Sequence, residues 1–242
     1  MAAQGEIKLG DEINVTVPTG NFGNILAGYF AKKMGLPVKT FVCASNINNV
    51  LTDFFTTGVY NKNRPFHVTK SPSMDILVSS NLERLLCLSA SQEKTKELMS
   101  DLNQFGKYSL DLTGGIIKGY CADDDETSKA IKEMYDKNGY VMDTHTAVAA
   151  STYKKYVAET NDDAVTVIAS TASPFKFARS VMDAINPEYD KLDDFKLIDE
   201  LSKIANVKIP NAIEEIRNAE VRHNNLVEVD GMEAIVKKFL NI

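Results

Sequence analysis

The sequence predicts an α/β fold built on an open, mainly parallel sheet with helices on both faces. Residues Ile13–Val17 alternate apolar and polar side chains and are rich in β-branched residues, which is typical of a strand. Residues Ile25–Met34 then have a helical pattern, which Gly35 and Pro37 end, and Val38–Ala44 follows as a second strand. A strand, a helix and a strand in this order form a right-handed parallel crossover unit.

The segments after this unit extend the alternation. We expect helices at residues 48–57, 75–89, 92–105 and 124–137. The last of these has acidic residues in its first turn and Gly139 just past its end, as the helix dipole and the αL cap favour. Residues Ala164–Ala169 form the clearest buried strand, and Ser173 and Pro174 then begin a helix as N-cap and first helical residue.

The C-terminal part is more polar. From about Tyr189 the chain has a helical pattern, and its last helix runs from about Gly231 to Leu240. We therefore predict an α/β domain at 5–188 and a helical C-terminal segment at 189–242 that packs on it.

Composition limits the classes of function. The chain has 242 residues, 44% of them hydrophobic and 25% charged, which suits one large domain with or without a small appendage. The net charge is −6 and no basic stripe is present, which argues against a nucleic-acid partner. No apolar run is long enough for a membrane span and no signal pattern begins the chain, so we expect a cytoplasmic protein. The sequence does not specify an oligomeric state.

Three isolated cysteines, Cys43, Cys87 and Cys121, are too widely spaced for a zinc site or a disulfide framework. We expect three thiols in or near the core, and no metal.

The strongest local signal is Val17-Pro-Thr-Gly-Asn-Phe-Gly-Asn24, between the first strand and the first helix. Gly20 and Gly23 allow a tight turn and a close backbone approach, and the N–H groups at a helix start favour an anion. The segment lacks the lysine of a Walker A motif and the spacing of a dinucleotide fingerprint. The alternative is an ordinary glycine-rich turn.

Three further segments carry polar side chains. Ser170, Thr171 and Ser173 follow the strand at 164–169, at the sheet edge where α/β proteins bind ligands, although they also suit helix capping. His145, in Met142–Val148, is more typical of a structural histidine than of a catalytic base, and Asp143 or Thr144 can cap the helix that follows.

The last segment is 70–84, whose polar residues could together bind a phosphate or could belong to a capped, solvated helix. These residues are Lys70, Ser71, Ser73, Asn81 and Arg84.

Taken in order, these segments resemble the threonine synthase family, which belongs to fold type II of the pyridoxal phosphate enzymes. The similarity covers almost all of the chain after about residue 5. Pro-Thr-Gly-Asn-Phe-Gly-Asn is similar to the family's phosphate-binding signature, and Ser-Pro-Ser-Met-Asp-Ile with Ser-Asn-Leu-Glu-Arg resembles the run that follows it. Thr-Ala-Ser-Pro-Phe-Lys-Phe177 is similar to the family's Thr-Ala-His-Pro-x-Lys-Phe segment.

The resemblance implies roles for individual residues. The cofactor phosphate is expected to be bound by Gly20, Asn21, Phe22, Gly23 and Asn24. Thr171 is expected to hydrogen-bond the pyridine nitrogen, where a neutral hydroxyl leaves that nitrogen unprotonated. As substrate contacts we expect Lys70, Ser71, Asn81 and Arg84. The implied reaction, a lyase step of threonine biosynthesis, converts O-phospho-L-homoserine and water to L-threonine and phosphate.

Three departures from the family pattern affect these expectations. The chain has Asp143-Thr-His-Thr146 where the family usually has Asp-Pro-His-Thr, and Ser173 where it usually has histidine. The family's Schiff-base lysine lies in a Phe-Lys-Asp context upstream of the phosphate signature, and this sequence contains no Phe-Lys-Asp. We therefore assign no catalytic residue and expect a fragment, without the family's small domain, that binds the cofactor weakly and is inactive alone.

Two alternatives remain open at this stage. One is another fold type II enzyme, such as threonine dehydratase or cysteine synthase. The other is a cofactor-free module that binds a different anion.

Overall fold

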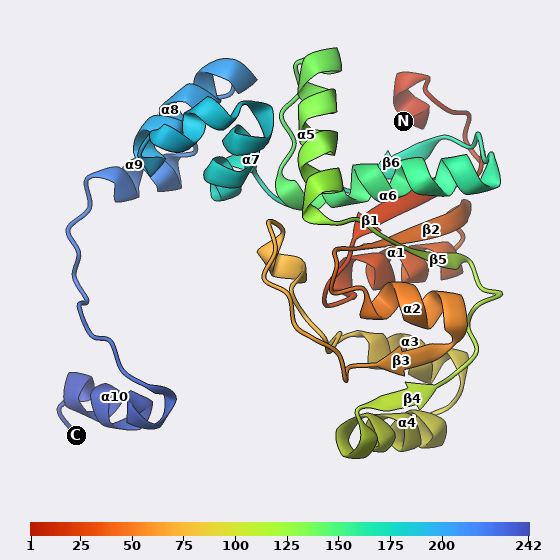
Figure 1. Cartoon of the computed structure of the whole chain (residues 1–242). Helices are drawn as coiled ribbons and strands as arrows, with labels where there is room; N and C mark the ends of the chain where they lie inside the picture. The colour runs from red at the N-terminus through yellow and green to blue at the C-terminus, as the bar shows by residue number, and fades with distance from the viewer. The chain divides into compact units, whose positions relative to one another are not determined.

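The computed structural model describes all residues 1–242, and they divide into two compact units, Met1–Val207 and Lys208–Ile242 (Figure 1). The division lies C-terminal to the boundary predicted at 188/189. Helix α8 (Asp194–Ala205) follows that predicted boundary, yet it contacts α7 (Ala178–Ile185) in the first unit. Leu197 and Leu201 of α8 are buried there.

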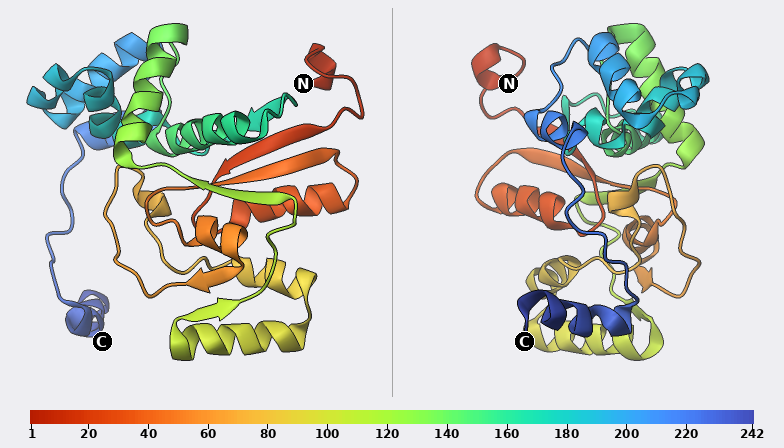
Figure 2. Two further views of the ribbon diagram at one scale, coloured as in Figure 1. Left: turned by 45° about the vertical axis from the view of Figure 1, so that its right-hand side comes forward. Right: turned by 90° about the vertical axis from the view of Figure 1, so that its left-hand side faces the viewer.

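A four-stranded, fully parallel sheet lies at the centre of the first unit. Its strands are β1 (Ile13–Pro18), β2 (Val38–Ser45), β5 (Ile117–Cys121) and β6 (Thr166–Ile168), in the order β5-β2-β1-β6. Helix α6 (Thr144–Thr160) covers one face, and α1 (Gly23–Lys33) and α2 (Val50–Thr57) cover the other (Figure 2). The predicted α/β fold class is therefore confirmed.

The remaining elements of this unit surround the sheet. Strands β3 (Val59–Asn61) and β4 (Lys107–Ser109) form a separate antiparallel pair. The other helices are α3 (Leu82–Ser89), α4 (Gln92–Phe105) and α5 (Asp124–Asn138). Helix α5 has an acidic first turn and ends at Gly139 in the αL conformation, as the sequence predicts. A capping box between Asp123 and Glu126 begins it.

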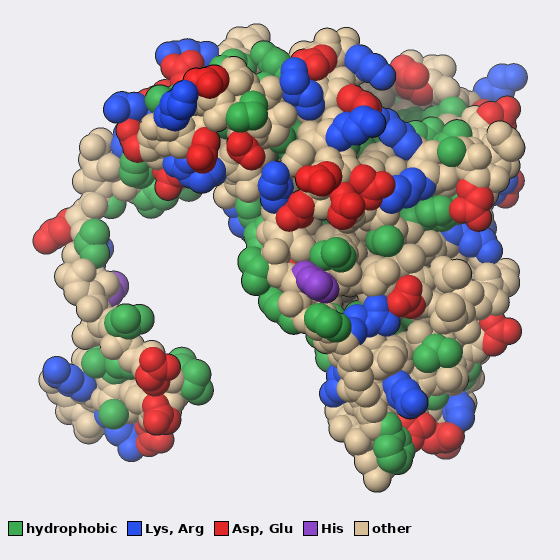
Figure 3. Space-filling model, viewed as in Figure 1, with side chains coloured by type: hydrophobic (Ala, Val, Ile, Leu, Met, Phe, Trp, Pro, Cys, Tyr) green, Lys and Arg blue, Asp and Glu red, His purple; other side chains and the backbone are tan.

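The second unit contains α9 (Asn211–Arg217) and α10 (Met232–Leu240). The predicted last helix is confirmed within one residue at its start. No helix of the chain is long and apolar enough to cross a bilayer. On the face shown in Figure 3, basic side chains lie among acidic ones over the first unit.

An aromatic cluster joins α2 to the β3–β4 pair. Phe54 packs against Phe55, Tyr60 and Tyr108, and the rings of Tyr60 and Tyr108 stack with centroids 5.0 Å apart. Phe22 joins the cluster through Phe55, at 5.8 Å between centroids. Of the three cysteines, Cys43 is buried in the sheet and the other two are half-buried, all as free thiols.

The helix predicted at 75–89 is wrong in its first half, because α3 begins only at Leu82. The side chain of Asp75 accepts hydrogen bonds from the Asn46 and Asn48 amides and from the backbone and hydroxyl of Thr69. These bonds fix residue 75 to distant segments, and a continuous helix from residue 75 would break them.

The strand predicted at Ala164–Ala169 is also less buried than expected. Strand β6 has three residues, all of them half-buried. It lies at the sheet edge and pairs only with β1, so its outer side has no neighbouring strand. The apolar run was correctly located, but a run of β-branched residues does not distinguish a central strand from an edge strand.

Asp162, just before β6, joins three elements of the first unit. Its carboxylate, with a side chain only 6% exposed, accepts hydrogen bonds from Asn14 of β1, Lys39 of β2 and Tyr156 of α6. The bonds from Tyr156 and Lys39 hold the pKa of Asp162 well below its usual range. The ionised carboxylate therefore stabilises the folded state.

Asp162→Asn is expected to lower the free energy of unfolding by about 2 kcal/mol at pH 7, since it removes charge-assisted hydrogen bonds. Because the folded-state pKa is depressed, this stabilisation is complete above the unfolded-state pKa near 4 and is lost as pH falls below it. Urea unfolding at pH 7 and at lower pH measures the difference, which should shrink in acid. Asp163→Asn, at an exposed neighbouring position, is the matched control.

Candidate functional site

The site lies where β1 ends, at the carboxyl edge of the sheet. Pro18 of β1 is paired with Ala44 of β2, and the N–H of Thr19 donates to the Ala44 carbonyl. The chain then turns through residues 19–22 into α1. Strand β6 pairs with β1 on the other side, so the segment after β6 leaves the sheet beside the 18–24 loop.

A cavity of about 350 Å³ opens at this edge. Every predicted cofactor-binding residue lines it: Gly20, Asn21, Phe22, Gly23, Asn24 and Thr171. Ser73 and Asn81 line it too, and no charged side chain does. The structure thus brings together residues from three separate segments that the sequence had singled out.

The 18–24 loop and the first turn of α1 carry unpaired donors. The backbone N–H groups of residues 20–25 have no acceptor in the protein, and the first intrahelical bond runs from Leu26 to Phe22. Helix α1 has no side-chain N-cap and no acidic residue in its first turn. A helix start without a cap presents its N–H groups and the positive end of its dipole to a ligand.

The carbonyl groups of Gly20 and Asn21 accept hydrogen bonds from Ser79 and Asn81. The Ser79 hydroxyl donates to the Gly20 carbonyl at 2.7 Å, and both the side-chain amide and the backbone N–H of Asn81 donate to the Asn21 carbonyl, at 2.8 and 3.0 Å. In a trans peptide the N–H points away from the carbonyl of the same plane. The N–H groups of Asn21 and Phe22 therefore point away from residues 79–81.

Phe22 has a backbone conformation that few L-residues adopt. Its φ is 66°, in the left-handed region, and its side chain is buried against Phe55. Such a conformation is unfavourable for a bulky residue, so the burial of the ring in the aromatic cluster stabilises the turn. The turn leads the chain into α1 with no side-chain cap, so the first N–H groups of the helix, which have no carbonyl partners in any α-helix, stay unpaired.

Gly20 is required by a close approach. A Cβ there would lie 3.0 Å from the Ser73 carbonyl oxygen and 3.3 Å from the Met74 Cα. At Gly23 a Cβ would meet only the Asn81 side-chain nitrogen, at 3.5 Å, which is an ordinary contact. The two glycines therefore differ in how tightly they are enclosed.

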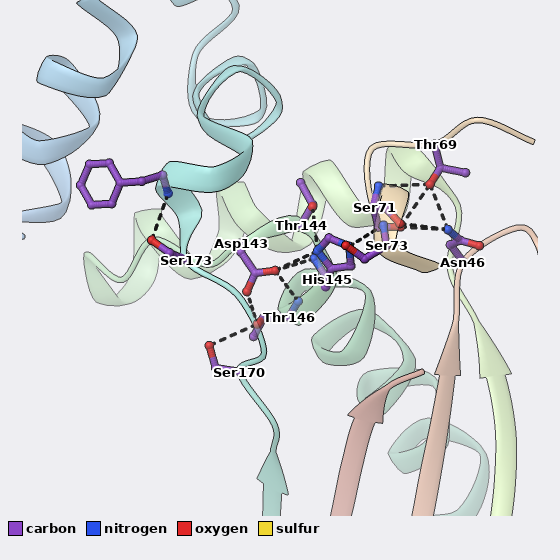
Figure 4. Close-up of polar contacts among 11 residues, drawn as sticks. Asn46, Thr69, Ser71, Ser73, Asp143, Thr144, His145, Thr146, Ser170 and Ser173 are labelled. Carbon is purple, nitrogen blue, oxygen red and sulfur yellow. Dashed lines mark hydrogen bonds and ion pairs between the residues drawn. The ribbon is translucent and has the colours of Figure 1, made fainter. Parts of the chain in front are cut away.

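His145 links α6 to the wall of the cavity. Its Nε2 accepts the Ser73 backbone N–H at 3.1 Å, and its Nδ1 lies 3.2 Å from Asp143 Oδ1 (Figure 4). Because Nε2 accepts, the hydrogen-bond network assigns the ring proton to Nδ1, which donates to Asp143. The ring also packs against Phe177, at 4.7 Å between centroids. With both nitrogens engaged, His145 has the contacts of a structural residue.

Of the two candidate caps, Asp143 and Thr144, it is Asp143 that caps α6, by accepting the backbone N–H groups of His145 and Thr146. Burial raises the pKa of this carboxyl, but the hydrogen bonds from His145 and Thr146 outweigh burial and leave the pKa below its usual value. Thr146 also donates to Ser170, in the segment after β6 (Figure 4).

The hydroxyls after β6 have different roles. Ser173 is the N-cap of the short helix Pro174–Phe177 and accepts the Phe175 N–H, which confirms the predicted capping. The Thr171 side chain is exposed at the cavity and has no hydrogen-bond partner in the protein. Thr171 is therefore free to meet a ligand, whereas Ser173 is engaged.

The predicted substrate contacts are only partly brought together. Asn81 lines the cavity, but its amide is committed to the 18–24 loop. Lys70 lies outside the cavity lining, donates to Ser128 and forms an ion pair with Asp183 at 3.7 Å. Ser71 is 1% exposed and accepts from the Asn46 amide, and Arg84 is exposed on α3, also outside the lining.

Ser79 was missed by the sequence reasoning. It lay inside the segment that was predicted to be helical, where a serine has no reason to reach another loop. The available signal was the cluster of Ser79, Ser80 and Asn81 just before the apolar face of α3, which is typical of a helix start rather than a helix interior.

The chain is similar to proteins named threonine synthase. Residues 146–234 match the family model described as threonine synthase, C-terminal. The chain is 41% identical over 196 residues to threonine synthase-like 1 of Homo sapiens, covering 76% of this chain and 26% of that protein. It is 36% identical over 242 residues to threonine synthase of Saccharomyces cerevisiae, covering 90% of this chain and 46% of that protein.

Solved structures agree with these similarities. The crystal structure of threonine synthase from Brucella melitensis with bound pyridoxal phosphate superposes with a TM-score of 0.70 at 31% identity, over 89% of this chain and 47% of that one. The yeast threonine synthase structure gives a TM-score of 0.68 at 33% identity, over 84% and 47%. The chain thus spans less than half the length of each of these relatives.

Gly20→Ala is expected to lower the free energy of unfolding by about 1–3 kcal/mol, because the new methyl group overpacks the backbone of residues 73 and 74. Gly23→Ala, with only an ordinary contact, is the matched control and should change stability little. Urea unfolding of both variants measures the difference. Equal stability of the two variants would show that the enclosure of Gly20 is not rigid.

Proposed function

The chain belongs to the threonine synthase family, and we propose that it forms the phosphate-binding half of a pyridoxal phosphate site. The enzyme of which this half is part would convert O-phospho-L-homoserine and water to L-threonine and phosphate. Threonine synthases are pyridoxal-phosphate-dependent lyases of amino-acid biosynthesis. The observation that carries the proposal is the run of unpaired N–H groups at residues 20–25 in an uncharged cavity.

The residues present suit the phosphate of this cofactor. Gly20, Asn21, Phe22, Gly23 and Asn24 would hold it through backbone N–H groups, as anions are held at helix starts. No carboxylate lines the cavity to repel a dianion. The absence of a Cβ at Gly20 allows the loop to pack closely against Ser73 and Met74.

Thr171 would meet the other end of the cofactor. It lines the same cavity on the opposite segment and its hydroxyl is unpaired, so it can hydrogen-bond the pyridine nitrogen without protonating it. When bound, pyridoxal phosphate supplies an electron-withdrawing ring that acidifies the proton at the substrate Cα. Thr171 would orient that ring, and Ser73 would limit how far the cofactor enters the cavity.

No lysine lines the cavity. Lys176 lies over the Phe177 ring, 5.2 Å from its centroid, and Lys70 is paired with Asp183. The 242 residues contain no Phe-Lys-Asp. We therefore assign the lysine that attaches the cofactor, and that moves protons at the substrate, to a part of the enzyme outside these residues.

For the substrate phosphate, Arg84 is the most accessible of the predicted contacts. It is exposed on α3, one turn after Asn81, which lines the cavity. Lys70 and Ser71 are already bonded to other protein groups, so they would hold segment 69–75 in place and would not bind the substrate directly.

The chain alone, supplied with pyridoxal phosphate, is expected to release no phosphate from O-phosphohomoserine above a protein-free control, because it offers no lysine at the cavity. A complete protein that includes this chain and an upstream Phe-Lys-Asp should release phosphate and form threonine. A colorimetric phosphate assay with amino-acid analysis measures both. Turnover by the chain alone would contradict our assignment of the lysine, and an inactive complete protein would contradict the proposed reaction.

Borohydride reduction of the chain with pyridoxal phosphate is expected to give no stoichiometric adduct, since any attachment would be scattered over exposed lysines. Intact mass spectrometry followed by peptide mapping measures the number and position of adducts. A single lysine modified to one equivalent would show that these residues do contain the attachment site.

A further inference from the structure

We propose that Ser79 is a positioning residue that sets the direction of one phosphate-binding N–H, that of Asn21. This inference rests on the proposed function, because it concerns how the same loop recognises the phosphate. None of the motifs that carry the family resemblance assigns a role to Ser79, and its side chain does not line the cavity of about 350 Å³.

Ser79 is held in place by its contacts with the core. Its side chain is largely buried and its backbone N–H donates to the Tyr60 hydroxyl at 2.9 Å. Tyr60 is 1% exposed within the aromatic cluster, and its hydroxyl donates to the Leu77 carbonyl at 3.1 Å. Burial raises the pKa of Tyr60 to about 12, so this hydroxyl remains a donor at neutral pH. Ser79 is therefore tied to the aromatic core through Tyr60.

From this fixed position the Ser79 hydroxyl donates to the Gly20 carbonyl at 2.7 Å. The carbonyl of Gly20 and the N–H of Asn21 belong to one trans peptide plane and point in opposite directions. Holding the carbonyl toward Ser79, which lies outside the cavity lining, thus turns the N–H of the cavity-lining residue Asn21 to the opposite side.

The next peptide plane is held differently. The Asn21 carbonyl accepts two hydrogen bonds from Asn81, whereas the only side chain or backbone donor to the Gly20 carbonyl is Ser79. Loss of the Ser79 hydroxyl therefore frees one peptide plane and leaves its neighbour fixed.

That plane adjoins a glycine, which rotates with little steric restriction. If it turns over, a carbonyl oxygen replaces an N–H at the cavity, and an attraction for phosphate becomes a repulsion. Ser79 prevents this rotation through a single hydrogen bond. The affected group recognises only the phosphate, so the rest of a ligand should be bound as before.

The test compares Ser79→Ala with Ser80→Ala in the full 242-residue chain. Ser80 is exposed and its hydroxyl donates only to the Asn21 side chain, at 3.3 Å, so it is a matched control beside the same loop. The probes are pyridoxine 5′-phosphate and inorganic phosphate, which have no aldehyde and cannot attach to surface lysines. Equilibrium dialysis gives their affinities, and pyridoxine without phosphate serves as the comparison ligand.

We expect the unaltered chain and Ser80→Ala to bind pyridoxine phosphate more tightly than pyridoxine. Ser79→Ala should weaken pyridoxine phosphate and inorganic phosphate by about tenfold, the effect of one lost hydrogen bond of ordinary strength, and leave pyridoxine unchanged. Ser79→Thr, which keeps the hydroxyl, should restore phosphate affinity.

Other results separate the two proposals. If Ser79→Ala binds phosphate as Ser80→Ala does, or if Ser79→Thr loses as much affinity as Ser79→Ala, the positioning role is wrong. If Ser79→Ala weakens pyridoxine equally, Ser79 supports the whole cavity and the role in phosphate recognition is wrong. If the unaltered chain shows no preference for the phosphorylated ligand, the proposed function fails and this inference fails with it.

Discussion

The parallel register between β1 and its two neighbours is the constraint on which the site depends. Pro18 is paired with Ala44, and Thr16 with both Val42 and Ile168, so three strands end at the same edge. Parallel strands leave all their following segments at that edge, which is where open α/β sheets bind ligands. The 18–24 loop and Thr171 are about 150 residues apart in sequence, and the register alone places them on one cavity.

The N–H groups at this edge are unpaired because of what α1 lacks, and unpaired N–H groups at a helix start are where proteins bind anions. Helix α1 has neither a side-chain cap nor an acidic first turn, and Phe22 turns the chain in the left-handed region just before it. A side-chain cap would have satisfied one of these N–H groups internally. The unfavourable backbone of Phe22 is balanced by its ring in the aromatic cluster, so the energetics of the core and the chemistry of the loop are linked at one residue.

Sequence reasoning was accurate where the pattern is local. The strand at 13–17 and the helix at 92–105 follow from alternation, periodicity and caps within each segment. It was inaccurate where a long-range contact decides the conformation, as with Asp75 and the residues that follow it. It also missed β5, whose Gly119 reads as a loop residue but is needed because a Cβ there would lie 2.6 Å from the Thr52 Cα. The need for glycine at this position comes from the contact between α2 and β5, so no pattern within the strand itself indicates it.

The same distinction applies to His145, whose role depends on contacts with segments distant in sequence. Its sequence context was more typical of a structural histidine than of a catalytic base. The structure engages both ring nitrogens, one with the Ser73 N–H and the other with Asp143. The Ser73 carbonyl in turn lies against Gly20, so the imidazole and the 18–24 loop enclose the same residue from two sides. His145 therefore contributes to the candidate site by fixing Ser73, against which the 18–24 loop packs.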